Sequence, residues 1–233
     1  GGRVPDVLAG HSLGELSALC CSGVFELSDA VRVVRERGRA MQSAVPVGVG
    51  AMAAIIGLDD EQITSVCSDL STADSVVEAV NFNAPGQVVI AGHEGAVTQA
   101  VDALKSAGAK RAMPLPVSAP FHTSLMRPAG EHLDAVLSEL DLKAPTIPVV
   151  HNVHARTEDD PAAIHRLLVE QVSSPVLWTA CVAELKKLGA TTFIECGPGK
   201  VLSGLMRRID RDLTCSAIEE PEGLRSALAS TAS

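Results

Sequence analysis

Val7-Leu8-Ala9-Gly10-His11-Ser12-Leu13-Gly14-Glu15 is the stretch on which the fold of this chain depends. The run from Val4 to Ala9 is apolar, as is typical of a strand, and a helix is expected to begin near Leu13. Between them, residues 10–14 match the pattern G-x-S-x-G, which in this context forms a sharp turn that exposes the serine hydroxyl. We therefore predict that Ser12 is a nucleophile and that the amide of Leu13 faces a developing oxyanion. The alternative is an ordinary turn in which Ser12 only caps the helix.

The composition of the chain restricts its possible functions. A length of 233 residues suits one large domain or a domain with an insertion. The chain is 46% hydrophobic and carries a net charge of −9. The sequence has no Lys/Arg cluster of the kind that binds nucleic acid. It also has no apolar run long enough to span a membrane. The six cysteines form no Cys-x-x-Cys pair, so the sequence indicates neither a zinc site nor a disulfide framework. We expect a protein of the reducing cytoplasm.

Residues 50–117 have a pattern of their own. We expect, in order, a strand, a helix, two strands, a helix and a strand over residues 51–56, 59–70, 76–82, 87–91, 94–107 and 110–116. The order β-α-β-β-α-β is that of a ferredoxin-like unit. We therefore predict a small inserted ferredoxin-like subdomain over residues 50–117.

The remaining residues, 1–49 and 118–233, are predicted to form one large α/β domain. Strands are expected over residues 4–9, 146–152, 191–196 and 215–218. Helices are expected over residues 13–21, 29–43, 124–140, 161–172, 176–188 and 200–208, with Ser28 as the N-cap of the second helix. Alternation of strands and helices predicts a mainly parallel sheet that is covered on both faces. With the G-x-S-x-G turn at Ser12, the expected fold is α/β-hydrolase-like.

A serine hydroxyl needs a base to become a good nucleophile. Seven histidines are candidates, namely His11, His93, His122, His132, His151, His154 and His165. His122 is preferred because it lies in a Pro-bounded loop, residues 118–122, at the start of an expected helix. His151 and His154, which close a strand, stay possible. No acid stands out at a strand end as the third member of a triad, and this counts against a plain esterase.

Further motifs relate these residues to a known family. In chain order they are Gly10-His11-Ser12-Leu13-Gly14-Glu15, Arg37-Gly38-Arg39-Ala40-Met41-Gln42, Gly50-Ala51-Met52-Ala53-Ala54, Asn81-Phe82-Asn83-Ala84-Pro85-Gly86-Gln87, Pro120-Phe121-His122 and Gly197-Pro198-Gly199-Lys200. Together they resemble the malonyl-CoA:acyl-carrier-protein transacylases from about Val4 to Arg208. The acyltransferase domains of polyketide and fatty-acid synthases share these motifs.

The resemblance implies a role for each candidate residue. Ser12 would carry the malonyl group as an ester, and His122 would be its base. Arg37 would bind the free carboxylate of the malonyl group, for which a planar guanidinium is well suited. We expect no protein carboxylate near Arg37, so that its site awaits an anionic ligand. Gln171 would accept a hydrogen bond from the histidine through its carbonyl.

The resemblance also implies an activity and its partners. The enzyme would transfer malonyl from malonyl-CoA to the phosphopantetheine thiol of acyl carrier protein for fatty-acid synthesis, through a malonyl-serine intermediate. Coenzyme A enters as the thioester substrate and the partner carries the phosphopantetheine, so we expect no cofactor and no metal. We expect a monomer that meets the acidic carrier protein through a local Lys/Arg patch. Asn83 and Gln87 would face the cleft without a catalytic role.

Three other functions stay open at this point. A serine hydrolase of thioesters or esters would need a triad acid and would have no use for a buried arginine. An acyltransferase domain of a polyketide synthase would share the motifs, and a scaffold piece would bind carrier protein without turnover. In the family, a strand and a glutamine-containing loop precede the turn and supply a second oxyanion-hole amide. This sequence begins at Gly1 without them and without an initiator Met, so we expect the natural protein to be longer.

Overall fold

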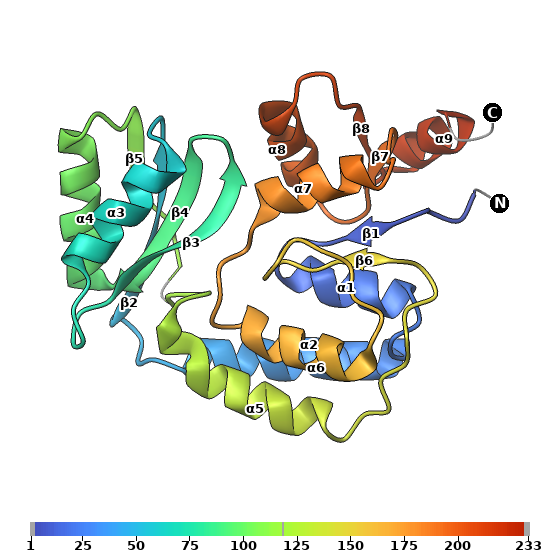
Figure 1. The fold of residues 1–233 in the computed structure, drawn as a ribbon, viewed down its shortest axis with the longest axis horizontal. Coiled ribbons are helices and arrows are strands. Elements are labelled where there is room, and N and C mark those ends of the chain that lie inside the picture. The colour runs from blue at the N-terminus through green and yellow to red at the C-terminus, as the bar shows by residue number, and fades with distance from the viewer. Residues whose placement is uncertain (1–2, 118, 231–233) are drawn as a thin grey trace.

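The computed structural model describes residues 3–117 and 119–230, which form an α/β fold (Figure 1). Ser118, part of the expected loop before His122, and the first two and last three residues lie outside the described residues. Two groups of helices enclose a short pair of parallel strands, and a separate sheet with its own two helices stands to one side. In the described part, no helix combines the length and the apolar character that crossing a membrane requires.

The strand before the turn is shorter than expected. β1 (Leu8–Ala9) pairs in parallel with β6 (Val149–Val150). Side chains alternate across this pair: Leu8 and Val149 belong to one core, while Ala9 and Val150 belong to another. In Figure 1 the pair lies between a lower group of helices, α1 (Leu13–Cys21), α2 (Leu27–Ser43), α5 (Arg127–Leu137) and α6 (Pro161–Gln171), and an upper group, α7 (Trp178–Lys187) and α8 (Val201–Ile209).

Two of the lower helices differ from the expectation. α2 begins at Leu27 with Glu26 as its N-cap, because the Ala30 amide already donates to the Glu26 carbonyl at 2.9 Å; the prediction of Ser28 as cap was wrong. The helix expected over residues 124–140 is a 3₁₀ turn, η1 (Ser124–Met126), followed by α5. Pro128 in the first turn of α5 has no N–H with which to continue the turn before it.

The upper group holds a second parallel pair rather than an extension of the first. β7 (Phe193–Glu195) pairs with β8 (Cys215–Ala217), and α9 (Pro221–Ser230) follows. The described residues therefore form two separate two-stranded parallel sheets where one mainly parallel sheet was expected. α9 was not expected, although Pro221 at its first position and Glu222 in its first turn are helix-start signals.

The separate sheet contains the expected elements of residues 50–117. They are β2 (Gly50–Ile56), α3 (Asp60–Leu70), β3 (Val77–Ala84), β4 (Gln87–His93), α4 (Glu94–Ser106) and β5 (Arg111–Pro114). The strand order is β3-β4-β2-β5 and all neighbours are antiparallel. Ala53 and Ile55 point toward the core shared with α3 and α4, whereas Met52 belongs to a smaller cluster on the other face.

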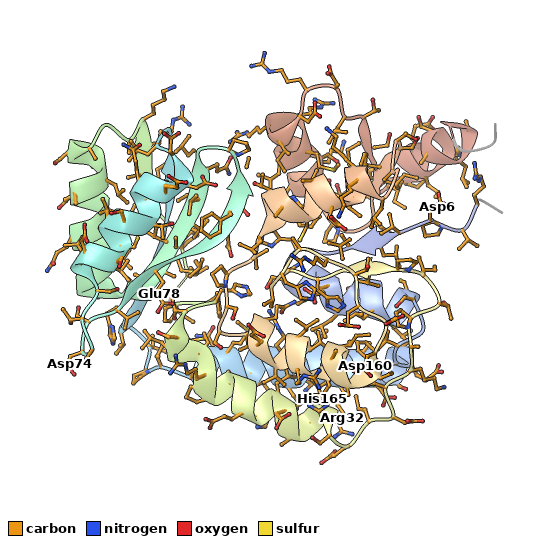
Figure 2. The ribbon with its side chains drawn as sticks, in the orientation of Figure 1. Asp6, Arg32, Asp74, Glu78, Asp160 and His165 are labelled. Atoms are coloured by element: carbon orange, nitrogen blue, oxygen red, sulfur yellow. The ribbon has the colours of Figure 1, made fainter. Side chains whose placement is uncertain are left out.

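Several hydrogen bonds join this sheet to the rest of the chain. The Phe82 amide donates to Val176 O at 3.0 Å, and the Val176 amide donates to Val80 O at 2.8 Å. Glu78 accepts from the Ser124 amide at 2.9 Å and from the Ser124 hydroxyl at 2.6 Å. Figure 2 shows Glu78 at the part of the sheet nearest α5. The Ser124 bonds hold the segment that follows His122 against the sheet.

Candidate active site at the turn after β1

The turn from β1 to α1 is strained at Ser12. Ser12 has φ 53° and ψ −104°, a backbone conformation that a residue with a side chain rarely adopts. A Cβ on Gly10 would lie 1.9 Å from the carbonyl carbon of Gly14, whereas a Cβ on Gly14 would meet nothing within 4 Å. Close packing therefore requires a glycine at Gly10 and not at Gly14. Ser12 occupies the N-cap position of α1, but its side chain makes no capping hydrogen bond.

Asn152 holds this turn in place. Its Oδ1 accepts from the Ser12 amide at 2.7 Å, and its Nδ2 donates to Gly10 O at 2.7 Å. The Asn152 side chain is fully buried, and its bond to Gly10 O is shielded from water. Our sequence analysis did not identify Asn152. The available signal was its place two residues after β6, because carboxyl ends of parallel strands meet at one edge.

The structure brings His122 to Ser12. Its Nε2 lies 2.7 Å from Ser12 Oγ, and its Nδ1 lies 2.9 Å from the backbone oxygen of Gln171. A carbonyl oxygen only accepts, so Nδ1 carries the proton and donates it, and Nε2 is left to accept from the Ser12 hydroxyl. His122 has φ 66°, so the residue that faces Ser12 is strained as well.

The environment of His122 keeps its imidazole neutral. Only 4% of the residue is exposed. Burial, and next the positive charge of Arg37, lower the pKa of His122 from 6.5 to about 3. At neutral pH the ring is therefore neutral, and its unprotonated Nε2 can accept a proton from Ser12.

Arg37 reaches the same hydroxyl from α2. Its Nη2 donates to Ser12 Oγ at 2.9 Å and to Gln171 Oε1 at 2.9 Å. The residue is 5% exposed, and its Nε is buried without a partner. Burial lowers the pKa of Arg37 to about 10, and the negative charge of Glu15 opposes that shift. The guanidinium is thus a buried cation at neutral pH.

A buried carboxylate, Glu15, lies in the same network. It accepts from His151 Nδ1 at 2.7 Å, from the Asn152 amide at 2.9 Å and from Gln171 Nε2 at 2.8 Å. The same Gln171 amide group accepts from Arg37 through its oxygen. The expectation that no protein carboxylate lies near Arg37 was therefore wrong. A sequence signal existed, since Glu15 ends the motif in the first turn of α1, where the helix dipole favours a negative charge.

The other histidines have different partners. His151 is fully buried on Glu15, and the His154 ring lies edge-on to that of His151. His11 Nε2 lies 2.8 Å from Asn83 Oδ1, and burial lowers the pKa of His11. Asn83 thus faces the turn from β3.

The remaining predicted residues lie as follows. Gln87 accepts from Arg208 of α8. Leu13 is the first residue of α1, so its amide has no partner within the helix. Among the described residues, no group of three or more His, Cys, Asp or Glu side chains is arranged to hold a metal ion.

Comparison with known proteins gives a consistent result. The family described as acyl transferase domain matches residues 1–213. The malonyl CoA-acyl carrier protein transacylase of Salmonella typhimurium is 54% identical over 228 residues, which are 98% of this chain and 74% of that protein. The protein of the same name from Bacillus subtilis is 46% identical over 97% of this chain and 72% of its own length.

Solved structures are similar along almost the whole chain. The acyl-carrier-protein S-malonyltransferase of Burkholderia pseudomallei superimposes with a TM-score of 0.95 at 52% identity, over 98% of this chain and 74% of that one. A malonyl-transacylase solved in complex with a type II PKS acyl-carrier protein gives a TM-score of 0.96 at 47% identity, over 99% and 73%.

Proposed function

Because this chain belongs to the acyl transferase domain family, we infer that it transfers a malonyl group from malonyl-CoA to the phosphopantetheine thiol of acyl carrier protein. Relatives of 54% and 46% identity carry the name of this activity, and one similar structure holds an acyl-carrier protein as its partner. The enzyme is an acyltransferase with a serine nucleophile, and its product supplies fatty-acid synthesis.

One observation carries this inference: a base and a cation converge on a single hydroxyl. His122 Nε2 lies 2.7 Å and Arg37 Nη2 lies 2.9 Å from Ser12 Oγ. The base activates the hydroxyl, and the cation is placed to bind an acyl group that ends in a carboxylate. A hydrolase of neutral acyl groups would have no use for a buried guanidinium at this point.

The first half-reaction loads the enzyme. Ser12 Oγ attacks the thioester carbonyl of malonyl-CoA while its proton passes to His122 Nε2. The Nδ1 bond to Gln171 O holds the ring in the orientation that this transfer needs. The Leu13 amide stabilises the oxyanion that develops on the carbonyl oxygen. Collapse breaks the C–S bond, the proton on Nε2 goes to the coenzyme A sulfur, and malonyl-Ser12 remains.

The second half-reaction reverses these roles with a different thiol. The phosphopantetheine thiol of the carrier protein gives its proton to His122 Nε2 and attacks the malonyl ester. The C–O bond to Ser12 breaks, and the proton returns to Ser12 Oγ. Arg37 binds the free malonyl carboxylate throughout, which keeps the acyl group in place between the two steps.

A hydrolytic function has less support. The partner of His122 Nδ1 is a backbone carbonyl, whereas a hydrolase triad has a carboxylate in that place. A carboxylate raises the basicity of the imidazole more than a neutral carbonyl does, and a weaker base favours acceptors that give up a proton more easily than water. A thiol is such an acceptor.

The test is to incubate the protein with malonyl-CoA and to measure its intact mass. We expect one malonyl adduct, which peptide mapping assigns to Ser12 and which phosphopantetheinylated carrier protein removes faster than buffer does. Adduct loss to water at the same rate as to carrier protein would support the hydrolase instead. Absence of an adduct would contradict covalent transfer.

We assign residues 50–117 to a ferredoxin-like subdomain inserted in an α/β-hydrolase-like domain of residues 1–49 and 118–233. Support comes from the antiparallel order β3-β4-β2-β5 and from the parallel β1-β6 pair that precedes the strained Ser12.

The two half-reactions use only Ser12, His122, Arg37 and backbone groups, so the proposed reaction requires no metal or redox cofactor. Residence in the cytoplasm agrees with six cysteines that are all free.

A further inference from the structure

We propose that Glu15 is a positioning residue for acyl-group selection, because it holds Arg37 in place through the Gln171 side chain without binding Arg37 itself. The inference rests on the proposed function and names a determinant of its substrate preference. Glu15 contacts neither the Ser12 hydroxyl nor His122. It would therefore act through Gln171 and Arg37.

Burial and charge make Glu15 the counter-charge of this site. Both Glu15 and His151 are 0% exposed, and Arg37 is 5% exposed. A buried guanidinium is costly unless an opposite charge compensates it, and Glu15 is the carboxylate whose charge favours protonated Arg37. Three hydrogen-bond donors and the first turn of α1 surround that carboxylate with positive partial charge.

The Gln171 side chain connects the two charges in a defined direction. Its Nε2 donates to Glu15 Oε2 at 2.8 Å and to Ser12 O at 3.1 Å. Since a carboxylate only accepts, the amide nitrogen must face Glu15, and the amide oxygen must then face Arg37 Nη2, 2.9 Å away. Glu15 therefore determines which way the Gln171 amide points, and Gln171 aims the guanidinium.

A neutral spacer leaves the cation available to the substrate. A carboxylate in direct contact with Arg37 would occupy the planar fork, and a malonyl carboxylate would have to displace it. Glu15 and Arg37 form no direct ion pair, and their charges compensate each other across one amide. The arrangement keeps Arg37 charged, oriented and ready for an incoming carboxylate.

The experiment is to measure kcat/KM for malonyl-CoA and acetyl-CoA in the wild type and in Glu15→Gln. The variant keeps the size of the side chain but removes the charge and the preference for the amide nitrogen of Gln171. We expect kcat/KM for malonyl-CoA to fall about tenfold or more, and kcat/KM for acetyl-CoA to fall much less. Glu170→Gln, at an exposed position of α6 beside Gln171, is the matched control and should change neither.

Introducing Glu15→Gln into the Arg37→Ala variant distinguishes a positioning role of Glu15 from a merely structural one. In Arg37→Ala, adding Glu15→Gln should leave the malonyl/acetyl ratio unchanged, because Glu15 acts on selection through Arg37. An equal fall for both substrates in Glu15→Gln, or a further change of the ratio in the Arg37→Ala background, would overturn the inference.

If Glu15→Gln does not fold, as judged by circular dichroism, Gln171→Met tests the same connection. It removes the side-chain amide and retains Glu15 and the backbone carbonyl that accepts from His122. The ratio should again fall, and an unchanged ratio overturns the inference. If the wild type transfers neither acyl group, the proposed function is overturned as well. If the wild type prefers malonyl-CoA and the variant has the same malonyl/acetyl ratio, only the role of Glu15 is overturned.

Discussion

The sheet of residues 50–117 and the site around Ser12 differ in what they bury. The core between that sheet and its helices α3 and α4 is apolar. In the part of the chain that the structure describes, the buried polar or charged side chains all lie outside residues 50–117. They are Glu15, Ser22, Arg37, His122, Thr123, His151, Asn152, Gln171 and Glu195.

The backbone shows the same difference. The described non-glycine residues with positive φ are Ser12, His122 and Ala155, and none of them belongs to the separate sheet. A regular sheet satisfies its own backbone groups and needs only apolar packing. A site that aims a hydroxyl, an imidazole and a guanidinium at one point requires strained backbone, held by a buried polar network. Most of these strained and buried polar residues thus lie in or next to the site around Ser12, while Ser22 and Glu195 are buried elsewhere.

The strongest test of this contrast is Ser12→Ala. Loss of the hydroxyl should abolish the malonyl adduct and lower kcat by about a millionfold, the effect of removing a serine nucleophile elsewhere. The fold should persist, since alanine is small enough for the turn. Intact-mass measurement after incubation with malonyl-CoA checks the result, with Ser17→Ala, an exposed position of α1, as control. A malonyl adduct on Ser12→Ala would mean that the nucleophile lies elsewhere.

The next effect belongs to His122→Ala. Without the base, both half-reactions should slow by about 100- to 10,000-fold, because one imidazole serves in each. Stopped-flow measurement of adduct formation and of its transfer to carrier protein gives the two rates separately. His132→Ala, a half-exposed histidine on α5, should leave both rates unchanged. A fall in only one half-reaction would contradict a shared base.

The pH profile of the same residue provides a second measurement. Its pKa is lowered from 6.5 to about 3, so the acid limb of kcat/KM should lie well below pH 6.5. Between these two values the unfolded chain binds the proton more readily. The stability that neutral His122 contributes is therefore complete above pH 6.5 and is lost as the pH falls toward 3. An acid limb at pH 6.5 would show that His122 is not held neutral.

Arg37→Ala should have a smaller and more selective effect. Loss of the charge-assisted hydrogen bonds to a malonyl carboxylate should cost about 1.5–3 kcal/mol of discrimination, or roughly 10- to 150-fold. Transfer from acetyl-CoA, which has no such carboxylate, should fall little or rise. Arg39→Ala, an exposed neighbour on α2 paired with Glu36, controls for the loss of positive charge. An equal fall of kcat/KM for both substrates would make Arg37 a structural residue.

Glu78→Gln tests the contact between the two regions. Glu78 receives two hydrogen bonds from Ser124, two residues after His122, whereas Asp74 lies in the loop between α3 and β3 (Figure 2). A neutral amide keeps the shape but weakens both bonds, so we expect kcat to fall a few-fold, on the order of 1 kcal/mol. Asp74→Asn should leave kcat unchanged. A combined Glu78→Gln and Ser124→Ala variant that loses the sum of both single effects would show that the two residues do not act together.

The smallest effect on transfer should come from Ile90→Ala in the apolar core of the sheet. Ile90 is 0% exposed, so the cavity should lower the free energy of unfolding by about 2–5 kcal/mol. The kcat of the protein that stays folded should barely change, because Ile90 contributes no group to the site. Urea unfolding and kcat at low temperature measure the two quantities, and Met113→Ala, half exposed on β5, is the control. A large fall in kcat without loss of stability would break the contrast between the two regions.

Much of the architecture could be predicted because its signals are local. The helix over residues 13–21, the proline that starts α6 and the alternating strands of residues 50–117 follow from spacing and turn chemistry within a few residues. Strand lengths could be predicted less well, because they depend on pairing with a distant segment. β1 and β6 are each two residues long, since the two strands pair only over those residues.

The site divides in the same way. The sequence by itself determined the strained turn at Ser12, since Gly10 must pack against the backbone of Gly14, and its motifs indicated His122, Arg37 and Gln171. Only the tertiary structure decided the partners of Glu15 and Asn152, which lie 136 to 156 residues away in the sequence. A buried polar group is stable only when another group satisfies it, and the folded chain alone determines which groups meet.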